Sequence, residues 1–419
     1  MAGIFVLAAL LWVTEALPLF ATSLLVVGLQ MVLLANPGDR PGLGFQSGAS
    51  PSYRDILSTA ADPVLVLFFG GFVLARAAVK EGVDRAISTL LLRRCGGEPR
   101  WVLLGLMLIT LLFGMWMSNT ATAAMMLALV APMLAALPPQ EPFRKALVLA
   151  VAFTANISGM STPIASPPNA VAISFLQKSG HTIAFLDWML VAVPLAVGMT
   201  LFTWLVLWRF FAPPTHGLRL AHFNERLTGR SWFVMIGFAI TVLLWMTDLW
   251  HGLPPAVVAL LLVVVLTTTG IIDHEDLARL EWSILILISG GISLGTGMQL
   301  TGLDQAVAQW LPATGESGFW LLVVLVMATL VVGTFMSNTA AANLFLPIGL
   351  SSAAIFDAQG GLYPIQVAMS IALAASMSMA LPISTPPNAL AYASGEVASR
   401  DLARVAFAIG ARGAGHRSR

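Results

Sequence analysis

Long, continuous apolar runs separated by short polar segments make up most of the chain. Runs of this length are typical of helices that span a membrane. They predict the same order of elements in each half: two helices, a helix with a Gly-Gly pair, a short amphipathic stretch, an apolar hairpin and a helix interrupted by prolines. In the first half the predicted ranges are about 2–16, 18–35, 61–80, 82–95, 101–137 and 143–180. In the second half they are about 232–250, 254–270, 281–300 and 302–311, then a hairpin, and about 363–396.

Two polar motifs interrupt these apolar runs, and each of them occurs twice. Ser118-Asn119-Thr120 recurs 219 positions later as Ser337-Asn338-Thr339. Ser166-Pro167-Pro168-Asn169 and Thr385-Pro386-Pro387-Asn388 have the same spacing. A single tripeptide of this kind would most simply cap a helix, and a single Pro-Pro-Asn would form a turn. Two motifs repeated in register instead indicate an internal repeat around one composite binding site, as in secondary transporters.

Basic residues indicate that the two halves have opposite orientations in the membrane. Lys and Arg are concentrated at both ends of the first hairpin, whereas none occurs between Arg279 and Arg400. Because Lys and Arg favour the cytoplasmic side, the first hairpin is predicted to open to the cytoplasm and the second to the opposite face. The predicted fold is therefore an all-α polytopic membrane protein with inverted-topology repeats, two helical hairpins and two broken helices.

The predicted domain boundaries follow from this repeat. Residues 1–212 are predicted to form the first inverted repeat, 213–230 a cytoplasmic linker and 231–419 the second inverted repeat. The first half ends with a helix at about 186–211 that has no predicted equivalent in the second, so the final helix is expected to be missing. Scaffold helices are predicted at about 1–95 and 231–311, and each hairpin with its broken helix at about 101–212 and 317–396.

The composition excludes a soluble protein and gives no indication of an enzyme. Apolar residues make up 58% of the 419, charged residues 10%, and the mean hydropathy is +0.87. No soluble domain of this size needs such an apolar chain. No nucleophile–base pair and no cluster of metal ligands is evident, so catalysis is not expected. The net charge of +1 gives no reason to expect nucleic acid as a partner, whereas the lipid bilayer is an expected one.

The motifs suggest how ions could be bound inside such a protein. Gly114 and Gly333 precede the tripeptides by one turn and would let the first hairpin arms unwind. The prolines leave carbonyl groups near Ala165 and Ser384 without N–H partners, which suits a weakly charged, hard cation. Four helix N-termini, each equivalent to about half a positive charge, favour a small dianion without Arg or Lys. The hairpin arms, about 17 residues or roughly 26 Å long, could either cross the bilayer or re-enter it.

The sequence resembles the divalent anion/sodium symporter (DASS) family of di- and tricarboxylate and sulfate carriers. The resemblance lies in the two Ser-Asn-Thr tripeptides, the two Pro-Pro-Asn motifs and the segment Trp12-Val13-Thr14-Glu15-Ala16-Leu17-Pro18. It covers essentially the whole chain. It implies re-entrant hairpins, a homodimer and an elevator-type movement of a transport domain against a scaffold.

The resemblance also implies roles for individual residues. The substrate would be bound by Ser118, Asn119, Thr120, Ser166, Pro167, Ser337, Asn338, Thr339, Thr385 and Pro386. About two sodium ions would be bound, by Gly114, Ser118, Asn119 and Ala165 in one half and by Gly333, Met336, Asn338 and Ser384 in the other. Family members often have a hydroxyl residue where Gly114 and Gly333 stand, so the cations are expected to depend more on carbonyl groups here.

The resulting prediction is a secondary active transporter of the plasma (inner) membrane. It would import small divalent anions, most readily C4 dicarboxylates, coupled to sodium and without an organic cofactor. Alternatives are a sodium-independent dicarboxylate exchanger, a sulfate or tricarboxylate carrier, and an inactive truncated relative. The selecting groups are generic hydroxyls and amides, so the sequence does not distinguish one small anion from another.

Overall fold

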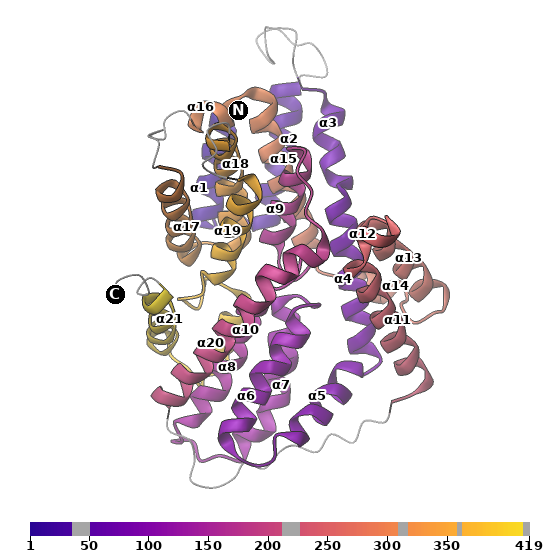
Figure 1. The fold of residues 1–419 in the computed structure, drawn as a ribbon, viewed down its shortest axis with the longest axis vertical. Helices are drawn as coiled ribbons and strands as arrows, with labels where there is room; N and C mark the ends of the chain where they lie inside the picture. Colours follow the sequence, from indigo (N-terminus) through magenta and orange to yellow (C-terminus); the bar gives the residue numbers. More distant parts are fainter. Residues whose placement is uncertain (36–50, 212–226, 309–316, 358–362, 414–419) are drawn as a thin grey trace. The chain divides into compact units, whose positions relative to one another are not determined.

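A computed structural model describes residues 1–35, 51–211, 227–308, 317–357 and 363–413, and the regular elements in these ranges are all helices (Figure 1). The predicted linker at 213–230 lies mostly outside the described residues. The helices of the first half are α1 Ala2–Thr14, α2 Leu19–Leu29 with its π-helical continuation Gln30–Ala35, α3 Tyr53–Ser58 with a 3₁₀ turn Thr59–Ala61, α4 Pro63–Lys80, α5 Val83–Arg94, α6 Pro99–Gly114, α7 Asn119–Ala135, α8 Phe143–Ser158, α9 Pro167–Lys178 and α10 Phe185–Phe210. Those of the second half are α11 Gly229–Met246, α12 Asp248–His251, α13 Pro255–Thr268, α14 His274–Ala278, α15 Trp282–Thr301, α16 Leu303–Ala308, α17 Ser317–Phe335, α18 Asn338–Asp357, α19 Pro364–Met377, α20 Pro386–Ala393 and α21 Ser399–Gly413.

The helix ends confirm the predicted hairpins and broken helices. Each hairpin turns at its tripeptide, since α7 begins at Asn119 and α18 begins at Asn338. Each broken helix restarts at the first proline of its Pro-Pro-Asn motif, at Pro167 and at Pro386. Proline is well suited to a first helical position, because the N–H that it lacks would have no partner there.

Five described helical segments are long and apolar enough to cross a membrane, which agrees with a multi-pass membrane protein. They are Tyr53–Lys80, Phe185–Phe210, Gly229–Met246, Trp282–Thr301 and Gly318–Phe335. Six shorter apolar helices accompany them, at Ala2–Thr14, Leu19–Ala35, Pro99–Gly114, Asn119–Ala135, Pro255–Thr268 and Pro364–Met377. Both arms of the first hairpin belong to the shorter group.

A helix also follows the second proline break. α21 holds the place in the second half that α10 holds in the first, but it has 15 residues and is not one of the five candidate spans. Leu402, Val405 and Ile409 are buried along one side, whereas Phe407 is exposed. The last described element is therefore a short amphipathic helix and not a candidate span.

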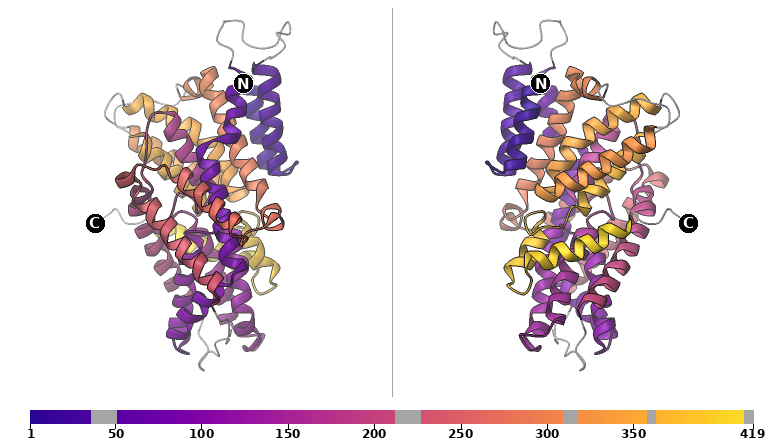
Figure 2. Two further views of the ribbon diagram at one scale, coloured as in Figure 1. Left: turned by 90° about the vertical axis from the view of Figure 1, so that its right-hand side faces the viewer. Right: turned by 90° about the vertical axis from the view of Figure 1, so that its left-hand side faces the viewer.

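The chain forms two compact units, and neither of them is one sequence repeat. Unit 1 comprises Met1–Phe69, Pro167–Ile183 and Glu281–Ser378, and unit 2 comprises Gly70–Ser166, Ala184–Leu280 and Met379–Arg419. In unit 1 the second hairpin and α19 pack side by side, which Figure 2 shows in orange to gold, and α9 of the first repeat packs on α18 and α19. In unit 2, α20 of the second repeat packs on α7 and α8. Each broken helix thus contributes one half to each unit.

Glycine allows close helix contacts in both units, as the Gly-Gly pairs predicted. In unit 1 a Cβ atom added at Gly290 of α15 would lie 2.2 Å from Cβ of Ser23 on α2. In unit 2 a Cβ atom added at Gly70 of α4 would lie 2.6 Å from Cβ of Ala259 on α13. Small residues at such crossings let helices approach closely within a membrane.

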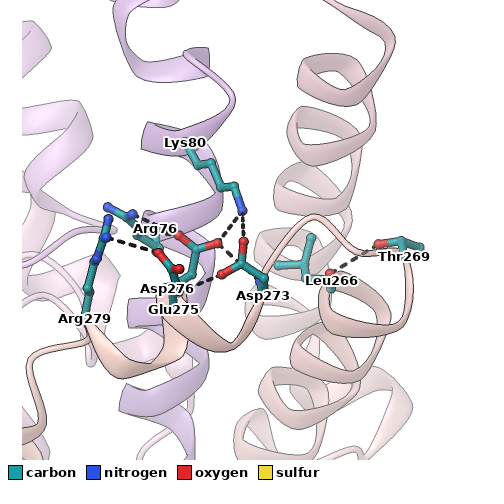
Figure 3. Close-up of polar contacts among 8 residues, drawn as sticks. All are labelled: Arg76, Lys80, Leu266, Thr269, Asp273, Glu275, Asp276 and Arg279. Atoms are coloured by element: carbon teal, nitrogen blue, oxygen red, sulfur yellow. Dashed lines mark hydrogen bonds and ion pairs between the residues drawn. The ribbon is translucent and has the colours of Figure 1, made fainter.

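A cluster of charged residues in unit 2 joins the end of α4 to α14 (Figure 3). Arg76 donates to Asp276 at 2.9 Å, and Lys80 donates both to Asp273 at 2.9 Å and to Asp276. The hydrogen bond from Lys80 lowers the pKa of Asp273 to about 2. Burial acts to raise the pKa of Asp276, but the hydrogen bonds from Lys80, the Asp273 backbone and Arg76 outweigh it and lower the pKa.

A second charged contact in unit 2 joins the base of the first hairpin to the C-terminal helices. Arg144 pairs with Glu396, and it also donates to the carbonyls of Leu134 and Leu137 near the end of α7. Lys145 pairs with Asp401 at 2.9 Å. These contacts connect the start of α8 with the segment between α20 and α21 and with the first turn of α21.

Candidate functional site

The tip of the first hairpin lies in unit 2 and is held by two side-chain hydrogen bonds. Ser118 caps α7 by accepting the backbone N–H of Ala121 at 3.2 Å. Thr162, from the unwound segment after α8, donates its hydroxyl to the carbonyl of Met115 at 2.6 Å. The first tripeptide therefore lies where a helix begins, beside the buried, non-helical segment that follows α8.

Asn119 of this tip has a buried amide oxygen without a hydrogen-bond partner among the described residues. Its amide group lies against α8, because a Cβ atom added at Gly159 would lie 2.6 Å from Nδ2 and 2.9 Å from Oδ1 of Asn119. A buried acceptor that no donor satisfies is costly unless an ion or water completes it. Oxygen atoms of this kind fit a hard cation such as sodium.

The restarted helix α20 brings the second Pro-Pro-Asn motif into the same unit. Thr385 caps α20 by accepting the N–H of Asn388 at 3.4 Å. The Asn388 side chain donates to the carbonyls of Met379 and Leu381 at 2.8 and 3.0 Å, and its oxygen accepts from Asn156 at 2.9 Å. The sequence predicts free carbonyl groups near Ser384. Two of the carbonyls in this region instead accept hydrogen bonds from the buried side-chain amide of Asn388.

The tip of the second hairpin lies in unit 1 and repeats part of this arrangement. α17 ends at Phe335, and α18 begins at Asn338. Asn338 again has a buried amide oxygen without a partner among the described residues. Met336 and Thr339 are buried as well. The restarted helix α9, with Pro167 at its start, packs against α18 in this unit.

The predicted site residues are thus divided between the two units. Unit 2 contains Gly114, Ser118, Asn119, Thr120, Ala165, Ser166, Ser384, Thr385 and Pro386. Unit 1 contains Pro167, Gly333, Met336, Ser337, Asn338 and Thr339. In each unit, a tripeptide from one repeat belongs to the same compact body as the restarted helix of the other repeat.

Several polar residues at these tips were not predicted as site residues. Thr162 holds the first tip. Asn388 holds the second break, and Asn156 donates a hydrogen bond to Asn388. Ser158 and Ser378 lie against Gly114 and Gly333, respectively. The signals were present in the sequence, since Asn156 interrupts an apolar run and the two serines repeat at a spacing of 220.

An aromatic cluster in unit 2 also holds the first tip. Trp116, just before Ser118, stacks on Phe185 of α10 and Trp245 of α11 at centroid distances of 6.3 and 6.5 Å. Phe238 meets it edge-on at 5.9 Å. Trp116 therefore anchors the tip by aromatic packing.

The hairpins, broken helices and inverted repeats define a multi-pass membrane transporter of the DASS type. The model of the citrate transporter family (CitMHS) matches residues 9–360 and, in a second match, 244–411. The chain belongs to this family. A solved structure with a similar fold is that of the YdaH transporter of Alcanivorax borkumensis, described as having an unusual topology. The TM-score is 0.55 at 14% identity, over 94% of this chain and 95% of that one.

Three relatives are similar along most of this chain. An uncharacterised transporter of Schizosaccharomyces pombe is 30% identical over 92% of this chain and 44% of its own length. The inorganic phosphate transporter PHO87 of Saccharomyces cerevisiae is 31% identical over 81% of this chain and 37% of its own length. The sodium-dependent dicarboxylate transporter SdcS of Staphylococcus aureus is 28% identical over 97% of this chain and 82% of its own length. The chain therefore spans less than half the length of the two yeast relatives.

Proposed function

We propose that the protein imports small divalent anions, most readily C4 dicarboxylates, together with sodium ions. The observation that carries this proposal is the same at both hairpin tips. A helix begins there, and an asparagine at that position, Asn119 or Asn338, has a buried amide oxygen for which the described part of the chain supplies no donor. A helix N-terminus favours an anion, whereas an unsatisfied oxygen favours a cation, so both ions would bind at adjacent points.

The anion would be bound without basic side chains. None of the predicted substrate residues is Lys or Arg, and the four helices that begin at the motifs are α7, α9, α18 and α20. Each N-terminus supplies unpaired N–H groups and about half a positive charge. Carboxylates of a small dianion would accept from these N–H groups and from the hydroxyls of Ser118, Ser337 and Thr385.

Sodium would link the two affinities. A cation at Asn119 or Asn338 would lower the electrostatic cost of bringing a dianion to the adjacent helix N-terminus, and the dianion would do the same for the cation. The name of the SdcS relative, a sodium-dependent dicarboxylate transporter, is consistent with this pairing. The family description and PHO87 make citrate and inorganic phosphate the competing substrates.

The proposal includes an elevator-type movement and a homodimer, both implied by the resemblance to DASS carriers. In this mechanism the hairpins and broken helices move together, and the scaffold helices stay fixed. Single-particle mass measurement of the detergent-purified protein tests the dimer: a mass of one protomer plus micelle would contradict it.

Uptake by reconstituted protein tests the function. Liposomes that contain the purified chain should accumulate labelled succinate under an inward sodium gradient and not under a choline gradient. Uptake that ignores sodium but requires internal succinate would instead identify an exchanger. A parallel thermal-shift panel with succinate, citrate, sulfate and phosphate identifies the preferred anion, and stabilisation by citrate or phosphate alone would refute the C4 assignment.

A further inference from the structure

In unit 2 the hydroxyl of Ser158 occupies the space that a side chain at Gly114 would need. A Cβ atom added at Gly114 would lie 1.9 Å from Oγ and 2.6 Å from Cβ of Ser158. Ser158 is the last residue of α8 and is completely buried. Its hydroxyl thus lies on the first arm of the hairpin, one turn before Ser118.

Unit 1 has the same arrangement at its own hairpin. A Cβ atom added at Gly333 would lie 2.6 Å from Oγ and 2.8 Å from Cβ of Ser378. Ser378 follows α19, as Ser158 ends α8, and it is also buried. The two pairs come from different repeats with different surrounding residues, so the same geometry occurs twice independently.

Both serines donate their hydroxyl proton to a backbone carbonyl. Ser158 donates to the carbonyl of Ala155 at 2.7 Å. Ser378 lies within 3.2–3.3 Å of the carbonyls of Thr329, Leu330 and Ala374, one of which can take its proton. A hydroxyl has one proton and two lone pairs, so each oxygen is left to act as an acceptor.

At each tip this hydroxyl oxygen is in the same unit as an amide oxygen that also lacks a donor. In unit 2 the Asn119 amide lies against Gly159, the residue next to Ser158, and its Oδ1 has no partner. In unit 1 the equivalent oxygen is Oδ1 of Asn338. Water would supply donors to such oxygens, but two buried acceptors without donors suit a small hard cation at least as well.

We infer that Ser158 and Ser378 are cation-binding residues, one for each hairpin tip, and that their hydroxyl oxygens complete sodium sites with Asn119 and Asn338. This inference rests on the proposed sodium coupling and adds two residues to it. The alternative is that the serines serve only as small residues for close packing against glycine.

A sodium titration of the purified full-length chain distinguishes these roles. The melting temperature is the readout, and choline keeps the ionic strength constant. Ser158→Ala and Ser378→Ala should each raise the sodium concentration for half-maximal stabilisation by roughly tenfold or more, the effect of losing one oxygen contact to a charged group. Thr110→Val and Thr329→Val are matched controls. Each removes a buried hydroxyl that donates to a carbonyl at 2.7 Å on the same hairpin arm, four residues before the glycine.

Two further variants keep the result clear if an alanine variant does not fold. Ser158→Cys preserves the size but replaces a hard oxygen by a soft sulfur, so it should weaken sodium binding like alanine. Gly114→Ser combined with Ser158→Gly moves the hydroxyl to the facing helix and should restore sodium binding. Gly114→Ser alone would meet Ser158 and should lower the melting temperature.

Unchanged sodium dependence in Ser158→Ala, Ser158→Cys and Ser378→Ala would overturn the inference and leave the proposed sodium coupling intact. An equal loss in the threonine controls would also overturn it, because the effect would then be general packing. If the unaltered protein is stabilised by succinate equally in sodium and in choline, the coupling itself fails, and the inference fails with it.

Discussion

The tips of the two hairpins have the same tripeptide, but different side chains hold them. At the first tip Trp116 is only 8% exposed and stacks on Phe185 and Trp245. The position 219 residues later is Phe335, which is 61% exposed. Thr162 also fastens the first tip through Met115, whereas the corresponding position of the second repeat is Leu381, which has no hydroxyl.

This difference separates the residues that make a binding tip from those that anchor it. The helix starts and the unsatisfied asparagine oxygens occur at both tips. Among the residues that the structure describes, the aromatic and threonine anchors occur at the first tip and not at the second. We therefore expect both tips to bind ions and the second to open more readily, since fewer buried contacts must be broken for it to move.

The largest expected effect is the loss of binding when either asparagine is removed. Asn119→Ala and Asn338→Ala should each abolish sodium-dependent anion binding, because each removes the oxygen proposed to lie between cation and anion. Binding of labelled succinate to purified protein measures this. Normal affinity in both variants would contradict ion binding at the two tips.

The next largest effect should distinguish the two anchors. Trp116→Ala removes a buried aromatic ring from a stacked cluster and should cost about 3–5 kcal/mol of stability. Phe335→Ala removes an exposed ring and should change stability by no more than about 0.5 kcal/mol. Thermal melting in one detergent measures both. Similar melting temperatures for the two variants would show that the first tip is not held by its tryptophan.

A smaller effect is expected from the hydroxyl of Thr162. Thr162→Val leaves the partly buried Met115 carbonyl without the Thr162 hydroxyl as its donor and should cost about 1–3 kcal/mol of stability. Thr154→Val is a matched control on α8, because the Thr154 hydroxyl is buried without a partner among the described residues. Removing the Thr154 hydroxyl should leave the stability of the protein unchanged or raise it slightly. A melting temperature lowered as much in the control as in Thr162→Val would remove the hydrogen bond as the cause.

The smallest effect concerns pH at the base of the first hairpin. Burial acts to raise the pKa of Asp401, but the hydrogen bonds from Lys145 and the Ala398 backbone, together with the positive charges of Lys145 and Arg400, outweigh it and lower the pKa in the folded state. The stabilisation is therefore fully present above the unfolded-state pKa of about 4 and is lost as pH falls through the lower folded-state pKa. The protection of the backbone amides at 396–405, that is, the intrinsic exchange rate at each pH divided by the observed rate, should therefore decrease as the pH falls below about 4. In Asp401→Asn this acidification should have less effect, and an identical acid response would contradict the assignment.

The repeats and the helix ends could be predicted from the sequence because they depend on local chemistry. Prolines stop and restart helices wherever they lie, so the breaks at Pro167 and Pro386 were predictable. The exchange of α9 and α20 between the compact units was not, because it depends on how distant segments pack. The hydroxyl group next to Gly114 could not be predicted from the local sequence either, because it belongs to Ser158 on another helix.

The most direct measurement of the central claim is the affinity of the purified protein for succinate as a function of sodium concentration, together with the reciprocal titration. If helix N-termini and asparagine oxygens bind dianion and cation at adjacent points, sodium should raise succinate affinity, and succinate should raise sodium affinity by the same factor. A succinate affinity that is the same in sodium and in choline would contradict the account.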